Sequence, residues 1–183
     1  EHKRAHFMTL RFDRLGNRKL HFHSLCGLAH ADYNQPGAWS YDLYFNMIRR
    51  LKLGQAALDE GFRRMAFNVI ACNRDDHTKN LGFLMTKPGV WELSPAYDIT
   101  YAHGTGWTSK HQMRVNNKVD GIGYADLLEV GEHEGIKKAK QIIAEINDAV
   151  RQWRKFSKKA KLSSEWIKRI EKDHQLEAIK TKR

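Results

Sequence analysis

Apolar residues recur at helical spacing in four stretches of the chain, at 40–51, 58–73, 139–153 and, more briefly, 163–170. This spacing places the apolar side chains on one face of an α-helix. Serines stand at the start of the first and last stretches, and serine is a favoured N-cap. From Tyr124 onward almost the whole chain follows the helical pattern. The sequence therefore predicts helices that pack their apolar faces on a common core.

Short extended segments interrupt this helical pattern in the first two-thirds of the chain. Residues 5–12 and 19–25 flank a turn-forming segment, and the two runs are predicted to form a β-hairpin. A second hairpin is predicted for 81–85 and 90–93, joined by Lys87-Pro88-Gly89, and 111–115 is a candidate short strand. The expected fold class is mainly α with short β-hairpins.

Composition indicates one globular domain and excludes several classes of protein. The 183 residues are 41% hydrophobic and 29% charged, with no run near the ~18 apolar residues of a membrane span and no apolar signal segment. Only two cysteines occur, Cys26 and Cys72, which indicates a reducing compartment and cytoplasmic localisation. The chain begins at Glu1 rather than Met, so we expect a piece of a longer protein.

The net charge of +11 is concentrated in a basic helical tail at about 151–183, which has 12 Lys or Arg and 4 Asp or Glu. Helical spacing would place five of its basic residues on one face: Arg151, Arg154, Lys155, Lys158 and Lys159. Such a face can bind DNA phosphates without reading bases. The alternative is an ordinary solvated basic helix.

A polar segment from Asn73 to Asn80 follows the second predicted helix and precedes the second hairpin. Asp75 and Asn80 lie five residues apart, and Asp98 follows the hairpin. Phosphoryl transfer requires a carboxylate to receive a hydroxyl proton, and amide and carboxylate oxygens to hold Mg²⁺ against ATP phosphates. The spacing matches a kinase catalytic loop. Two alternatives stay open: a solvated turn, and Asp76 in place of Asp75 as the proton acceptor.

Two motifs here, Asp75-x-His77-x-Lys79-Asn80 and Leu93-Ser94-Pro95-Ala96-Tyr97-Asp98, resemble the HipA family of bacterial serine/threonine kinases. These kinases are the toxins of HipBA-type toxin–antitoxin systems. Arg11-Phe12-Asp13-Arg14 resembles the hinge segment of that family, and the resemblance covers about residues 7–155. It implies a protein-kinase-like C-terminal lobe that uses ATP and Mg²⁺, a protein substrate, and a helix-turn-helix antitoxin as partner.

The resemblance also implies a role for individual residues. Asp75 matches the catalytic base, and Asn80 and Asp98 match the two Mg²⁺ ligands. The other matched residues would contact or border the nucleotide: Arg11, Phe12 and Asp13 at the adenine and ribose, His77, Thr78, Lys79 and Asn80 along the phosphates, and Tyr97 beside the metal ligand.

The chain departs from this family upstream of the hinge. Only ten residues precede Arg11, without the glycine-rich loop and strand lysine that a kinase of this type needs. We therefore expect the whole chain, 1–183, to be a C-terminal lobe that is inactive alone. A small-molecule or lipid kinase, or a nucleic-acid-associated module that has kept the lobe, are the alternatives.

Other residue types with reactive or binding side chains have simpler interpretations. His21, His23, Cys26 and His30 are of zinc-ligand type, but their spacing fits no common zinc module. Cys72, at the end of an apolar helix, is expected to be a buried small residue. The five tryptophans are scattered and are expected to pack in or near the core.

Overall fold

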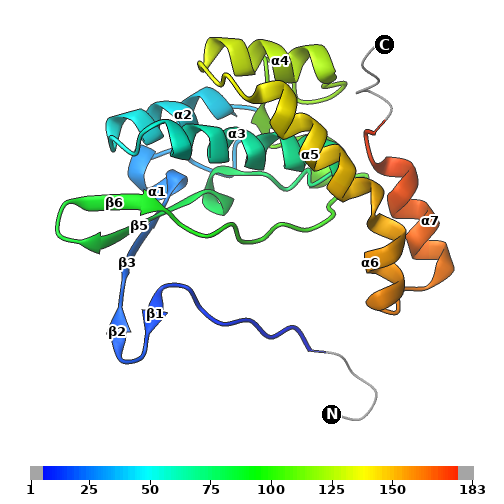
Figure 1. The fold of residues 1–183 in the computed structure, drawn as a ribbon, viewed down its shortest axis with the longest axis horizontal. Helices are drawn as coiled ribbons and strands as arrows, with labels where there is room; N and C mark the ends of the chain where they lie inside the picture. The colour runs from blue at the N-terminus through cyan, green and yellow to red at the C-terminus, as the bar shows by residue number, and fades with distance from the viewer. Residues whose placement is uncertain (1–5, 177–183) are drawn as a thin grey trace.

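A computed structural model describes residues 6–176, and within that range the chain forms seven α-helices and three small β-sheets (Figure 1). The strands are β1 Arg14–Leu15, β2 Arg18–Lys19, β3 His21–Ser24, β4 Trp39–Ser40, β5 Gly82–Lys87, β6 Val90–Leu93 and β7 Met113–Arg114. The α-helices are α1 Leu25–Ala29, α2 Tyr41–Arg50, α3 Gln55–Ile70, α4 Tyr124–His133, α5 Ala139–Arg151, α6 Trp153–Lys159 and α7 Ser164–Asp173. The mainly α fold class with short hairpins is confirmed.

Helix α3 lies at the centre of the core, with α2 and α5 packed against it (Figure 1). Phe45 and Ile48 of α2 and Phe62 of α3 are completely buried. Full burial of one such side chain contributes about 1.5–3 kcal/mol relative to exposure. Gly61 lets α2 and α3 approach closely, because a Cβ there would lie 2.9 Å from Ile48 Cδ1. The first three predicted apolar stripes thus form one core, whereas Ile167 and Ile170 of the fourth are buried outside that cluster.

The largest sheet is antiparallel, with strand order β3–β5–β6, and it lies beside the helical core (Figure 1). The predicted hairpin at 81–93 is confirmed as β5 and β6, which turn at Pro88-Gly89, where Gly89 has a φ of 77°. Gly82 pairs with Ser24, and a Cβ at Gly82 would lie 2.7 Å from Phe22 Cζ. The glycine therefore lets β3 pass directly over the end of the Asn73–Asn80 segment.

The predicted pairing of 5–12 with 19–25 is wrong. Residues 6–12 form no strand, and Phe7 is 94% exposed, while residue 5 lies outside the described residues. The hairpin is only β1 with β2, turning at Gly16, and β3 pairs instead with β5. The reason is burial: β5 offers the apolar core positions Phe83 and Leu84, whereas the first segment reaches no such partner.

The C-terminal helices differ from the pattern in one respect. The stripe at 139–153 predicts a continuous helix, but the chain breaks at Gln152, between α5 and α6. Ser163 is confirmed as an N-cap, since its hydroxyl accepts a hydrogen bond from the Trp166 amide at 3.4 Å. Ser40 occupies the N-cap position of α2, but its hydroxyl binds the Asp42 carboxylate rather than a helix amide. Of the predicted basic tail, residues 177–183 lie outside the described residues.

Candidate active site

The Asn73–Asn80 segment leaves the C-terminal end of α3 and closes in a short 3-10 helix, η1 (Thr78–Asn80), directly before β5. Its two adjacent aspartates point into opposite environments. The Asp75 side chain is 38% exposed, with His77 Nε2 3.7 Å from Oδ1. The Asp76 side chain is completely buried. The exposed carboxylate is therefore the one that a hydroxyl-bearing substrate can reach.

Asp76 is bound on every side by the protein. Oδ2 accepts a hydrogen bond from the Tyr41 hydroxyl at 2.9 Å and lies 3.0 Å from His111 Nδ1. Oδ1 accepts from the Gln112 amide at 2.8 Å. A buried carboxylate with these partners anchors the loop, because losing any of them would leave a buried charge without compensation. This geometry disfavours Asp76 as the proton acceptor.

The four residues after Asp76 combine structural and exposed polar groups. Thr78 is buried and its hydroxyl donates to the Ala31 carbonyl at 3.0 Å, so that side chain is held within the protein. Lys79 Nζ lies 3.6 Å from the centre of the Tyr33 ring, and His77 packs edge-on against the same ring. Asn80 Nδ2 donates to the Asp75 carbonyl at 2.9 Å. The loop is thus closed on itself, with the Lys79 ammonium held beside it.

Asp98 lies beyond β6 in an exposed segment that returns to the loop. Its backbone is left-handed, with a φ of 53°, and its carbonyl lies 3.4 Å from the Asn73 side-chain amide, which donates to it. The neighbouring Tyr97 donates its hydroxyl to the Lys79 carbonyl. Burial raises the pKa of Tyr97, so the phenol stays protonated and remains a donor. The two predicted metal ligands, Asn80 and Asp98, are therefore the sequence neighbours of Lys79 and Tyr97, which are hydrogen-bonded to each other.

The donor set suits Mg²⁺. Asn80 uses its amide nitrogen for the loop, and its Oδ1 accepts no hydrogen bond among residues 6–176. The exposed Asp98 carboxylate likewise accepts no hydrogen bond within this range. Mg²⁺ prefers such hard oxygen ligands and keeps several waters, so two protein ligands at an open site are sufficient. Asn80 and Asp98 fit the metal that phosphoryl transfer uses.

The predicted hinge residues line a cavity of about 520 Å³ that also includes Tyr97 and Asp98. Phe12 packs against Phe22 and Tyr97, with ring centres 5.8 Å apart in both pairs. Arg11 is bound to Asp13 through two hydrogen bonds, of 2.8 and 2.7 Å, and this interaction lowers the pKa of Asp13. The structure thus brings the hinge segment and the metal-ligand segment together, although they lie more than 80 positions apart in the sequence.

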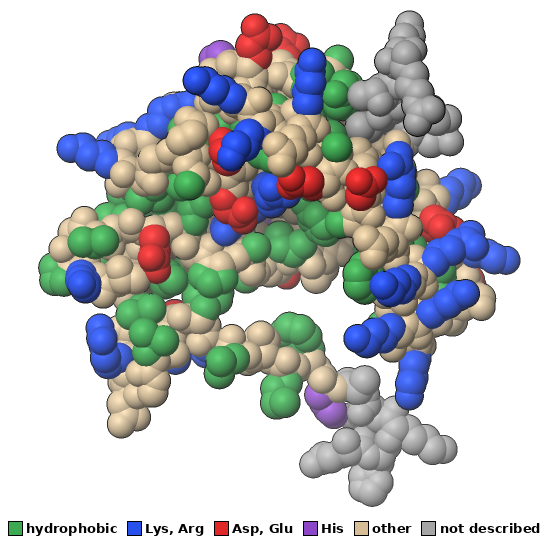
Figure 2. All heavy atoms as spheres, viewed as in Figure 1, with side chains coloured by type: hydrophobic (Ala, Val, Ile, Leu, Met, Phe, Trp, Pro, Cys, Tyr) green, Lys and Arg blue, Asp and Glu red, His purple; other side chains and the backbone are tan. Residues whose placement is uncertain are grey.

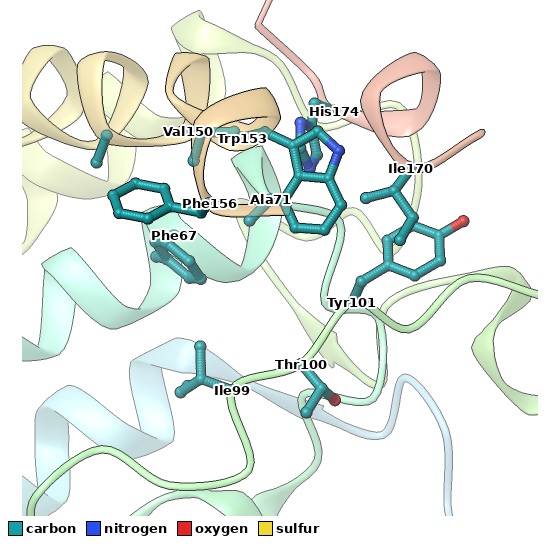
Figure 3. Close-up of a pocket in the computed structure, with 11 residues that line it drawn as sticks. Phe67, Ala71, Ile99, Thr100, Tyr101, Val150, Trp153, Phe156, Ile170 and His174 are labelled. Carbon is teal, nitrogen blue, oxygen red and sulfur yellow. The ribbon is translucent and has the colours of Figure 1, made fainter. Parts of the chain in front are cut away.

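A second pocket, of about 330 Å³, lies behind Asp98 between α3 and the C-terminal helices (Figure 3). Phe67, Trp153 and Phe156 point into it, and the Ile99–Tyr101 segment forms its floor. The lining is almost entirely apolar, so the pocket offers no partner for a triphosphate. Of these two pockets, the one at the hinge is the better match to a nucleotide, because charged residues such as Arg11 and Asp98 stand among its apolar lining.

The alternative metal and nucleophile candidates are not supported. His21 and His23 stack on each other, and in the described part of the chain the zinc-type set with Cys26 and His30 forms no metal-binding cluster. A different trio, Asp42, His133 and Glu134, does have its ligand atoms within 4.8 Å of one another. However, Glu134 is already paired with the Arg49 guanidinium at 2.5 Å.

Two further expectations concern the burial of Cys72 and of the tryptophans. Cys72 is buried as predicted, and burial raises the pKa of its thiol, which makes it a poor nucleophile. Trp107 and Trp166 are 45% and 49% exposed, so these two tryptophans are partly buried at the surface rather than in the core.

Lys and Arg side chains gather over α6 and α7 (Figure 2). Seven exposed basic residues there make no ion pair within residues 6–176: Lys155, Lys158, Lys159, Lys161, Lys168, Arg169 and Lys172. The predicted single face is corrected in two ways. Arg151 belongs to α5, before the break, where it pairs with Asp148, and Arg154 forms two 2.7 Å hydrogen bonds with Glu171. The basic patch, defined as the seven residues above, therefore extends over α6, α7 and the turn between them, and it leaves out Arg151 and Arg154.

Comparisons with known proteins identify a family and a similar fold. The HipA-like C-terminal domain family matches residues 1–153. Among solved structures, the chain is similar to one in the complex of HipA, HipB and operator DNA from the toxin–antitoxin system of Shewanella oneidensis MR-1, with a TM-score of 0.71 and 17% identity. The match covers 92% of this chain and 46% of that chain, so this chain spans about half the length of its structural relative. A search of curated proteins found no match.

The structural match, at this low identity, establishes the fold. The family match covers most of the chain and includes the Asn73–Asn80 segment, Asp98 and the hinge residues. The chain belongs to the family of HipA-like C-terminal domains.

Proposed function

We propose that this chain is the C-terminal lobe of an ATP- and Mg²⁺-dependent serine/threonine protein kinase of the HipA type. One observation carries the proposal: Asp75 is exposed beside a buried, fully bonded Asp76, and Asp98 returns to the same loop from beyond β6. Protein kinases need this combination of a reachable proton acceptor and a second acidic segment for the metal.

Each residue then has a chemical task. Asp75 accepts the proton of the attacking hydroxyl. Asn80 Oδ1 and the Asp98 carboxylate would hold Mg²⁺, which would supply charge neutralisation on the ATP phosphates. Lys79 is the nearest cation of the loop and attracts the same phosphates. Phe12 and Tyr97 offer ring faces for the adenine at the hinge cavity.

The nature of the acceptor is a separate part of the proposal. A protein serine or threonine is the acceptor implied by the family, and a small-molecule or lipid hydroxyl is the alternative, since the loop chemistry is the same for each. A helix-turn-helix antitoxin is the proposed partner, in view of the HipB present with the structural relative. The cytoplasm is the proposed location. No helix within residues 6–176 has the length and apolar character needed to cross a bilayer.

We expect the 183-residue chain alone neither to hydrolyse ATP nor to phosphorylate itself. Phosphoryl transfer depends on positioning the phosphates, and residues 1–10 of this chain contain no glycine from which a phosphate-binding loop could form. The measurement is release of labelled phosphate, and transfer to protein, with Mg²⁺ and γ-labelled ATP. Turnover that requires Mg²⁺ and disappears in Asp75→Ala would contradict this expectation.

A second function, contact with DNA, is favoured by the basic patch. Its seven cations lie on α6, on α7 and, in the case of Lys161, between the two helices, and all seven lie beyond the residues matched by the family. Two acidic residues of these helices, Glu171 and Asp173, are already paired, with Arg154 and His103. The exposed lysines are thus left available for phosphates, which gives affinity without base reading.

We expect the chain to bind duplex DNA weakly and without sequence preference. Changing Lys155, Lys158 and Lys159 together to Gln should weaken binding and flatten the slope of log affinity against log salt by about 1 for each DNA phosphate that is no longer neutralised. Fluorescence anisotropy at several salt concentrations measures both quantities. The matched control changes three exposed lysines elsewhere, Lys137, Lys138 and Lys140. An equal reduction in both triple variants would indicate a net-charge effect rather than a DNA-binding face.

A further inference from the structure

Tyr41, the first residue of α2, is buried beneath the catalytic loop. Its hydroxyl donates to Asp76 Oδ2 and accepts from Asn68 Nδ2, both at 2.9 Å. Burial, together with the Asp76 charge, raises the pKa of Tyr41 well above its usual value near 10. The phenol is therefore a permanent donor to Asp76, and its one hydroxyl connects helix α3 to the loop.

On one side, this connection leads to the proposed metal ligand. Asn68 Oδ1 accepts from Asn73 Nδ2 at 3.0 Å, and the same Asn73 amide donates to the Asp98 carbonyl at 3.4 Å. The Asp98 backbone is left-handed, which costs energy for a residue other than glycine, so surrounding contacts must hold it. Asn73 is one of them, and Ala102 is hydrogen-bonded to the backbone on both sides of Asn73.

On the other side, the connection leads to the proposed proton acceptor. Asp76 is held by Tyr41, His111 and the Gln112 amide, and its peptide neighbour is Asp75. Because these three contacts fix the Asp76 side chain in place, they also restrain the peptide that joins Asp76 to Asp75. All the side chains from Asn73 through Tyr41 to His111 are at most 3% exposed, so water does not replace a broken hydrogen bond.

We infer that Tyr41 is a positioning residue of the kinase site, an inference that rests on the function proposed above. Its hydroxyl joins a hydrogen-bonded path, Asn68–Asn73–Asp98 carbonyl, to Asp76, whose peptide neighbour is Asp75. These contacts fix the metal ligand relative to the proton acceptor. Tyr41 touches neither substrate nor metal and acts only through this chain of bonds.

The test compares Tyr41→Phe with Tyr44→Phe in the 183-residue chain. Tyr44 is one turn further along α2 and is also fully buried, but its hydroxyl has no hydrogen-bond partner among residues 6–176. Both changes remove one buried hydroxyl and keep the ring. Two quantities are measured by ¹H–¹⁵N spectroscopy: the amide signals of Asp75 and Asp98 without ligand, and the affinity for Mg²⁺·ATP.

We expect Tyr41→Phe to shift the amide signals of both aspartates and to weaken Mg²⁺·ATP binding about tenfold, the effect of losing roughly one buried hydrogen bond. Tyr44→Phe should leave both unchanged. A Tyr41→Phe chain that unfolds at a lower temperature, yet keeps both aspartate signals and the affinity, would show a merely structural hydroxyl and overturn the inference.

Asn68→Ala interrupts the same chain of bonds from α3 and serves if Tyr41→Phe does not fold. It should cause the same shifts at Asp98, and the double variant should be no worse than the single ones, because both break one chain. Additive effects would contradict a common path. If the unmodified chain binds no Mg²⁺·ATP, the proposed function fails, and the ligand-free signals of Asp75 and Asp98 alone decide the role of Tyr41.

Discussion

Replacing Asp75 by Asn, in a protein that combines this chain with an N-terminal kinase lobe, is expected to lower phosphoryl transfer by about 10²–10⁴-fold. The amide keeps the size of the side chain but accepts no proton. Because the side chain is exposed and holds no partner closer than His77 at 3.7 Å, folding should be unaffected. Mg²⁺·ATP affinity, measured by calorimetry, should stay nearly unchanged while the transfer rate falls.

Two controls accompany this variant. Asp148→Asn changes an equally simple surface carboxylate, 74% exposed on α5, and should leave the transfer rate unchanged. Asp76→Asn should lower the unfolding temperature, since it perturbs a buried carboxylate with three partners. An active Asp75→Asn protein beside an inactive but stable Asp76→Asn protein would reverse the assignment of the two aspartates.

The second large effect is expected for Asp98→Asn, again with the N-terminal lobe present. Loss of one of two proposed protein ligands should weaken Mg²⁺·ATP binding as well as abolish transfer. Asn is suited to this test because it tolerates the left-handed backbone of Asp98, so the substitution removes charge without adding strain.

Calorimetric titrations with ATP in the presence of Mg²⁺ and of a chelator separate the two contributions of Asp98. Metal-free ATP should bind the variant and the unmodified protein alike, because the hinge cavity is intact. Only the gain in affinity on adding Mg²⁺ should disappear. If that gain were the same in both proteins, Asp98 would not be a metal ligand.

The helices and the 81–93 hairpin could be predicted because their signals are local. The apolar stripe of α3 predicts which face of that helix is buried, and Pro88-Gly89 predicts the turn of the hairpin. The partner of β3 could not be predicted, because β5 lies about 60 positions further along the chain. Strand pairing depends on which segments the fold brings together, and the sequence near β3 does not identify β5 as its partner.

The spacing of Asp75, Asn80 and Asp98 suggested phosphoryl transfer, which stays a prediction. The structure places Asp75 and Asn80 in one loop and brings the Asp98 carbonyl to the first residue of that loop, Asn73. Which of two adjacent aspartates is buried was not decidable from the loop alone, because the partners of Asp76 come from 35 or 36 positions away. Tyr41 and His111 carry no local motif, so sequence reasoning missed both.

The most direct test of the central claim, that Asp75, Asn80 and Asp98 surround a metal–nucleotide site, is paramagnetic broadening in the 183-residue chain. Substoichiometric Mn²⁺ is added with ATP to the ¹⁵N-labelled protein, and the amide signals are followed. We predict selective broadening at Asp75, Asn80 and Asp98, which excess Mg²⁺ should abolish. Broadening confined instead to the trio of Asp42, His133 and Glu134, or spread evenly over the chain, would contradict the claim.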